Sequence, residues 1–286
     1  MVTSLVSVLF NGAAYGVTLF LMASGLSITM GLMNFANMAH GSLAMLGGYV
    51  AVVLMRHGWP FLATLPAAAL AAAAAGLIAE RLVFRYQYRR PELEQVLMTV
   101  GVVSMTVAGA TFVWGAGQQS IEMPGWLQGQ VELWGFGFNA YRLFLLVVGG
   151  LLTAALVMAI ERTSFGAKIR AAVDNRRMTA SVGIDVDGLF AVAFLLGSAL
   201  AGFGGALGVN LLGLDPNFPL KYLVYLLFVV VVGGLASIRG TLLGALLLGV
   251  CDVGGKYYLP QVGAFVLYAV VVAVLLYRPN GLVHRQ

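Results

Sequence analysis

Apolar runs long enough to cross a lipid bilayer follow one another along nearly the whole chain. A transmembrane helix needs about 20 mostly apolar residues, and LFLLVVGGLLTAALVMAI (143–160) lacks the alternation of a β-barrel strand. Only 9% of the residues are charged, against roughly 25% in soluble domains. The sequence therefore predicts an all-α, polytopic transmembrane helical bundle of about eight spans, formed by the apolar runs at about 5–26, 27–55, 61–79, 93–113, 143–160, 188–212, 222–237, 240–256 and 261–277.

The basic residues divide the connections between these runs into two sets. Alternating the helices places twelve Lys and Arg residues on one face and four on the other. Cytoplasmic loops are enriched in Lys and Arg, so the first face is predicted to be cytoplasmic and the protein to be a multi-pass membrane protein. The net charge of +5 then reflects orientation in the lipid, and no nucleic-acid partner is expected.

The longest basic connection on the cytoplasmic face is residues 161–188. Ser164 is predicted to cap a short helix that begins at Phe165, Asn175 to end that helix, and Gly183 to end a second one. The first helix carries an apolar stripe, typical of an anchor for a partner's groove, at Ile169, Ala172 and Val173. The alternative is a solvated, positively charged loop without a partner.

Polar residues interrupt the long N-terminal apolar region at GLMNFANMAHG (31–41). Polar groups at membrane depth are tolerated where they face protein or a water-filled cavity. The segment therefore indicates a broken or re-entrant helix. An ordinary short turn between two helices at the cytoplasmic surface explains the same residues.

Several kinds of chemistry are absent from the sequence. There is no GxxxxGK[ST] phosphate loop, no HExxH and no GxSxG, and Cys251 is the only cysteine. We expect no enzymatic activity, no metal site and no cofactor in this chain. Asp252 is the main acidic residue within an apolar run, and Lys256, four residues later, is positioned to pair with it.

Five segments, in this order, resemble the shorter permease subunit of branched-chain amino acid ABC transporters. They are GLSITMGLMNFANMAHGSLAMLGGYVA (25–51), LMTVGVVSMTVAGATFVWG (97–115), FGAKIRAAVDNRRMTASVGI (165–184), LLGSALAGFGGALG (195–208) and VVVVGGLASIRGTLLGALLLG (229–249). The resemblance implies a single permease domain over residues 1–286, located as a multi-pass protein in a bacterial inner membrane.

The same resemblance implies a set of partners. These are a second permease subunit, two cytoplasmic ATPase subunits that carry ATP and Mg, an extracytoplasmic solute-binding protein, and membrane lipid. The loop at about 161–188 corresponds to the family's ATPase-coupling loop. Its expected coupling residues are Gly166, Ile169, Arg170, Asp174, Asn175 and Gly183, with Ile169 added from the apolar stripe.

Polar residues inside apolar runs are candidates for lining a translocation path: Asn34, Asn37, His40, Thr99 and Ser198. Each is equally explained as a packing hydrogen bond between helices. The preferred function is an ATP-driven importer permease for branched-chain or related amino acids. The alternatives are an autonomous secondary carrier or channel for a small polar solute, and a structural subunit without a path.

Overall fold

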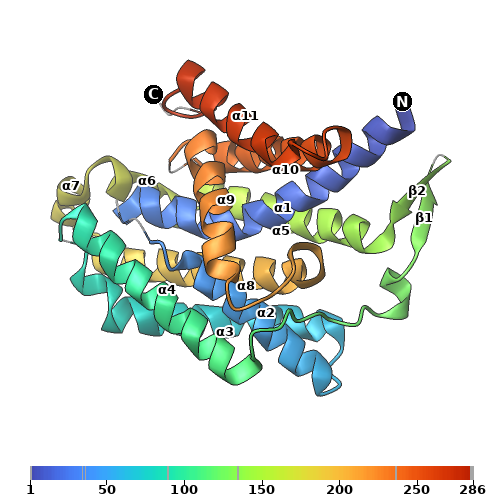
Figure 1. Cartoon of the computed structure of the whole chain (residues 1–286). Coiled ribbons are helices and arrows are strands. Elements are labelled where there is room, and N and C mark those ends of the chain that lie inside the picture. The colour runs from blue at the N-terminus through green and yellow to red at the C-terminus, as the bar shows by residue number, and fades with distance from the viewer. Residues whose placement is uncertain are drawn as a thin grey trace.

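The computed structural model describes residues 2–33, 35, 37–88, 90–133, 135–235 and 237–283, and helices dominate this part of the chain (Figure 1). The α-helices are α1 (Val2–Met33), α2 (His40–Arg56), α3 (Phe61–Leu82), α4 (Glu92–Trp114), α5 (Ala140–Arg162), α6 (Ser164–Asp174), α7 (Arg176–Ser181), α8 (Val186–Leu212), α9 (Phe218–Gly233), α10 (Ile238–Tyr258) and α11 (Gly263–Tyr277). Short 3-10 helices, η1 (Phe84–Tyr86) and η2 (Gly125–Leu127), and one hairpin, β1 (Gln130–Leu133) with β2 (Phe136–Asn139), complete the elements.

The helices confirm the predicted all-α polytopic bundle. Among the described residues, six helices are long and apolar enough to cross a membrane, namely α1, α3, α4, α5, α8 and α10. Three further apolar helices, α2, α9 and α11, are shorter. The two remaining helices, α6 and α7, lie together at one end of the bundle (Figure 1).

Polar contacts between segments show which helix ends lie together. Arg239, at the start of α10, pairs with Glu161 at the end of α5, next to α6. At the opposite end, Arg56 of α2 donates to Gln119, and Gln119 pairs with Leu214 after α8. The β1–β2 hairpin and the N-terminus also lie at that opposite end (Figure 1). This arrangement agrees with the predicted grouping of basic connections on one face.

Glycines allow the central helices to approach one another at backbone distance. A methyl group built on Gly25 of α1 would lie 2.6 Å from the Cα of Gly197 in α8, and one built on Gly16 would lie 2.6 Å from the carbonyl oxygen of Ala245 in α10. Gly205 of α8 faces the backbone of Ala44 in α2 in the same way. Small residues permit such approaches between membrane helices. The core is therefore built around α1, α8, α2 and α10.

The hairpin between α4 and α5 is an addition that the sequence did not predict. Its strands are four residues each, and Phe138 of β2 packs on Phe10 of α1 with ring centroids 4.5 Å apart. The hairpin therefore rests on the N-terminal part of α1. Short strands of this kind give only a weak sequence signal beside long apolar helices.

Candidate coupling loop and translocation path

The loop between α5 and α8 folds as two short helices joined at one asparagine. Asn175 ends α6, where its backbone NH donates to the Ala171 carbonyl at 2.9 Å, and caps α7, where its side-chain oxygen accepts from the Met178 NH at 3.0 Å. Gly183 follows α7 with a φ of +83°, the left-handed conformation that favours glycine. Both predicted helix ends are confirmed. The cap of α6 is Thr163, whose hydroxyl accepts from the Gly166 NH, and not Ser164.

Helix α6 is fastened to the end of α5 by two of the expected coupling residues. Arg170 donates to the Ile160 carbonyl near the end of α5. This carbonyl has no NH partner within α5, because the helix ends before the residue that would supply it. Gly166 packs directly on the Ile160 backbone, so a Cβ there would collide with it. Arg170 and Gly166 therefore set the angle between α5 and α6.

The apolar stripe of α6 faces the protein's own core. Ile169 and Ala172 are buried, and Val173 packs partly buried against the same core. The interpretation of this stripe as an anchor for a partner's groove is therefore wrong. An amphipathic pattern identifies a face to be covered, and here the bundle itself covers it.

The exposed apolar residues of the loop lie on α7 and just after it. Met178 and Val182 are four residues apart, which places them on one helical face, and they are 66% and 76% exposed. Asp174 and Asn175 are also exposed. Sequence reasoning missed this apolar pair, although two large apolar residues inside a charged loop were the available signal.

Arg176 connects α7 to α8. Its Nη2 donates to the Asp187 Oδ1 at 2.8 Å, and its guanidinium carbon lies 4.8 Å from the centre of the Phe190 ring. Asp187 is in the first turn of α8. The loop is thus attached to the bundle at both ends, by Arg170 to α5 and by Arg176 to α8.

The connection between α1 and α2 enters the bundle. His40, the first residue of α2, has its Nε2 3.0 Å from the Met22 carbonyl of α1. Met22 lies eleven residues before the end of α1, about 16 Å along the helix axis. Asn37 and His40 are each 1% exposed. Helix α2 therefore begins inside the bundle, which favours the broken-helix interpretation over a surface turn.

Two polar atoms at this break have no hydrogen-bond partner among the described residues. Asn37 uses its side-chain oxygen to accept from the Ala39 NH at 3.0 Å, while its Nδ2 is unpartnered. The Nδ1 of His40 is likewise unpartnered. Buried polar atoms normally have partners, so these two atoms are exceptions among the described residues of the break. Asn34 lies outside the described residues.

The other path candidates are engaged in hydrogen bonds within their own helices. The Thr99 hydroxyl donates to the Val96 carbonyl at 3.0 Å, and the Ser198 hydroxyl donates to the Phe194 carbonyl at 2.7 Å. Both residues are buried, and Ser198 packs against Gly76 of α3. Among the described residues, no hydrogen bond joins Thr99 or Ser198 to Asn37 or His40.

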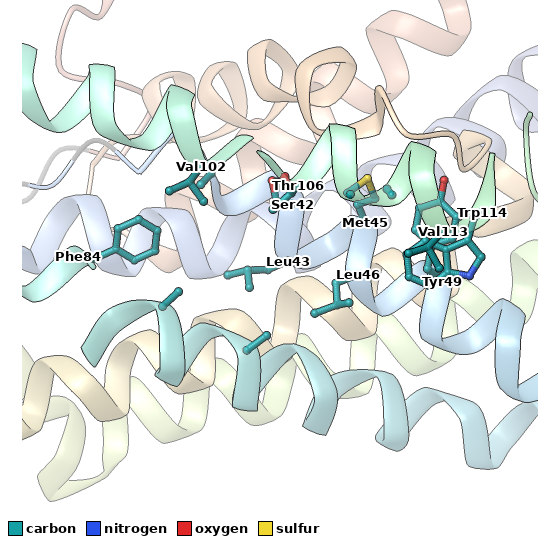
Figure 2. Close-up of a pocket in the computed structure, with 15 residues that line it drawn as sticks. Ser42, Leu43, Met45, Leu46, Tyr49, Phe84, Val102, Thr106, Val113 and Trp114 are labelled. Carbon is teal, nitrogen blue, oxygen red and sulfur yellow. Dashed lines mark hydrogen bonds between the residues drawn. The ribbon is translucent and has the colours of Figure 1, made fainter. Parts of the chain in front are cut away.

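An apolar cavity of about 320 Å³ lies between α2, α3 and α4. Figure 2 shows it running from Phe84 to the stacked rings of Tyr49 and Trp114, with Leu43, Leu46 and Val102 along its sides. The Ser42 and Thr106 hydroxyls meet across it at 2.7 Å. Because these hydroxyls satisfy each other, the cavity offers few polar groups to a charged solute.

Asp252 is paired with Lys256 as expected, since the Lys256 Nζ donates to the Asp252 Oδ2 at 2.6 Å. Its carboxylate is buried and the lysine is half exposed. One oxygen of the carboxylate that a secondary carrier would need is therefore engaged by a lysine of the same helix, and its Oδ1 has no hydrogen-bond partner among the described residues.

Comparisons with known proteins identify the family that this chain resembles. The family model described as "branched-chain amino acid transport system / permease component" matches residues 8–275. The high-affinity branched-chain amino acid transport permease BraD of Pseudomonas aeruginosa is 28% identical, over 97% of this chain and 95% of its own length. LivH of Escherichia coli K12 is 26% identical, over 97% and 94%.

A probable branched-chain amino acid transport permease of Methanocaldococcus jannaschii is 27% identical, over 96% of this chain and 91% of its own length. No solved structure gives a significant match. The matches extend over the helices of the bundle and the α6–α7 loop alike. The chain therefore belongs to the permease component family of branched-chain amino acid transport systems, as a multi-pass membrane permease subunit.

Proposed function

We propose that this permease subunit imports branched-chain amino acids across a bacterial inner membrane at the expense of ATP hydrolysed by partner subunits. The observation that carries the substrate class is the match over residues 8–275, together with relatives that are named as branched-chain amino acid transport permeases. The chain has no phosphate loop, so ATP and Mg belong to two cytoplasmic ATPase subunits. A second permease and an outer solute-binding protein complete the importer.

The α6–α7 loop is the site proposed to receive the ATPase. Met178 and Val182 form its exposed apolar contact, and Asp174 and Asn175 lie beside them as exposed polar groups. Apolar anchors within a polar rim are typical of protein interfaces. Gly166, Ile169 and Arg170 act by holding α6 on the bundle, and Gly183 by ending α7.

The break before α2 is the proposed polar part of the translocation path. An amino acid zwitterion needs hydrogen-bond partners inside the membrane because an unpaired charge there is costly. The Asn37 Nδ2 and His40 Nδ1, which have no partner among the described residues, lie at this break. The cavity beside α4 is lined almost wholly by apolar side chains, and the Tyr49 hydroxyl is its one lining atom of this kind among the described residues, so the cavity is not proposed as the path of the zwitterion.

Uptake by the assembled complex in proteoliposomes tests the substrate class. Radiolabelled leucine should accumulate only with ATP inside and binding protein outside, and unlabelled isoleucine or valine should compete. Accumulation of none of these amino acids by an ATP-hydrolysing complex would refute the proposed substrate. Leucine uptake driven by an ion gradient, by this chain alone, would instead support a secondary carrier.

Val182→Asp tests the docking surface. The new carboxylate must be desolvated within an apolar contact, so ATPase recovered with the permease should fall by at least about tenfold, which is about 1.4 kcal/mol. Val262→Asp is the matched control, because Val262 is also exposed but lies at the far end, between α10 and α11. Equal ATPase recovery with both variants would contradict docking at Val182.

A further inference from the structure

Five aromatic side chains from three separate segments form one cluster beside the α6–α7 loop. Phe35 precedes α2, Phe84 and Tyr88 lie between α3 and α4, and Phe190 and Phe194 belong to α8. Ring centroids are 5.6 Å apart for Phe35 and Phe84, 5.4 Å for Phe35 and Tyr88, 5.5 Å for Phe84 and Phe194, and 6.2 Å for Tyr88 and Phe190. These separations are those of direct aromatic packing.

The cluster is buried except at two edges, because Tyr88 is partly exposed and Phe84 borders the apolar cavity beside α4. Its four phenylalanines are among the largest fully buried side chains. Tyr88 is held from the outside, where its hydroxyl donates to the Glu80 Oε1 at 3.3 Å, and burial, with the neighbouring Glu80, raises its pKa, which keeps the hydroxyl protonated. Close-packed interiors transmit displacement and do not absorb it.

Arg176 places the coupling loop in contact with this cluster. Its guanidinium lies over the Phe190 ring and its Nη2 bonds Asp187. The guanidinium is therefore fixed in direction by the carboxylate and in position by the ring. A movement of α7 larger than rotation of the Arg176 side chain can follow would displace Phe190 or break both contacts.

The opposite side of the cluster reaches the break in the first transmembrane region. Phe35 touches Phe84 and Tyr88 and lies two residues before Asn37, whose side chain holds the turn into α2. Helical backbone resists bending, whereas the described residues between α1 and α2 are not helical. The contacts of Phe35 therefore end on described residues that no helical hydrogen bonds hold in place.

We propose that Arg176 and Phe190 are positioning residues that transmit movement of α7 through Tyr88 and Phe35 to the break before α2. The proposal rests on the proposed function, because it takes the α6–α7 loop as the place where the ATPase acts. It assigns the aromatic cluster the role of coupling ATP hydrolysis to rearrangement around Asn37 and His40. Arg170 and Ile169, on α6, have no part in this route.

Phe190→Leu and Arg176→Gln test the proposal in the complete reconstituted importer. The leucine removes the ring beneath the guanidinium, and the glutamine, at a half-exposed position, removes the cation without leaving a buried cavity. Both variants should keep bound ATPase while the ATP hydrolysed per leucine transported rises by at least about fivefold, the lower end of measured coupling between sites. Arg176→Lys keeps a cation over the ring and should lose less than Arg176→Gln.

Hydrogen exchange of the backbone at residues 35–40 supplies a second readout that a purely structural role would not change. Exchange should differ between nucleotide-bound and nucleotide-free complexes of the unmodified protein, and that difference should shrink in Phe190→Leu. Phe228→Leu is the matched control, because Phe228 packs edge-on against Tyr268 at 5.7 Å, between α9 and α11.

Three outcomes are decisive. Normal coupling in both Phe190→Leu and Arg176→Gln, with the ATPase bound, would overturn the proposal and leave docking at α6–α7 intact. Loss of bound ATPase in both variants would also overturn it, because the residues would then serve docking. Failure of the unmodified permease to bind any ATPase would be a failure of the proposed function itself.

Discussion

Helices α8 and α4 are both apolar enough to cross a membrane, but α8 is mostly buried within the bundle and α4 is mostly exposed on its surface. In the apolar stretch of α8 that is long enough to span a membrane, 61% of the residues are buried, whereas 17% are buried in the corresponding stretch of α4. A Cβ built on Gly197, Gly202 or Gly205 of α8 would collide with α1, α3 or α2, respectively. A Cβ built on Gly101 or Gly109 of α4 would have no atom of another segment within 4 Å. Hydropathy therefore identifies a span, whereas close backbone contact determines which span is central.

The largest expected effect comes from filling one of these central contacts. Gly205→Val would drive its side chain into the Ala44 backbone of α2, which cannot rotate away as a side chain can. We expect a loss of at least about 3 kcal/mol in the free energy of unfolding, the upper end of overpacking costs. Equilibrium unfolding in mixed micelles measures it.

Gly101→Val in α4 is the control for that substitution. Gly101 has open space where the side chain would go, so the change should lie within about 0.5 kcal/mol. Comparable losses for Gly205→Val and Gly101→Val would break the distinction between the two helices.

A smaller effect is expected at the outer end of α4. Trp114 stacks on Tyr49 of α2 with ring centroids 4.3 Å apart and planes at 21°, and stacking of this kind contributes about 0.5–1.5 kcal/mol beyond apolar burial. Trp114→Leu should lower the unfolding free energy by at least that amount. Trp59→Leu, at a half-exposed tryptophan, should lower it less, and the reverse order would exclude the stack as an anchor of α4.

The smallest effect is expected midway along α4. The Ser42 and Thr106 hydroxyls share a hydrogen bond of 2.7 Å, and such bonds between membrane helices average about 0.6 kcal/mol. Ser42→Ala should cost about that much. Ser104→Ala removes a hydroxyl that bonds only within α4, to Val100, and a cost as large as that of Ser42→Ala would show that the link between α2 and α4 contributes nothing.

The sequence predicted those features that local chemistry decides. The spans follow from apolar length, and the ends of α6 and α7 follow from Asn175 and Gly183 because caps depend on a few neighbouring residues. The break before α2 follows from polar residues that an ordinary span excludes. Family resemblance added the role expected of the α6–α7 loop.

Features that depend on contacts between distant segments were not predictable in the same way. A stripe such as that of Ile169 shows that a face must be covered, but not whether the bundle or a partner covers it. The sequence does not show whether a hydroxyl such as that of Ser198 bonds within its own helix, as it does here, or to another segment. The aromatic cluster joins Phe35, Tyr88 and Phe190, which are far apart in the sequence. No local sequence pattern predicts such a cluster.

The central position of α8 also has a consequence for how the protein is made. Helices α2 and α3 find their main backbone partner in a helix that ends at Leu212, 156 residues after the end of α2 at Arg56. At 5–20 residues per second, the ribosome needs about 8–30 s to supply it. During that interval the glycine faces of α2 and α3 that α8 will cover have no permanent neighbour, so these early helices depend on the insertion machinery to hold them until the late helix arrives.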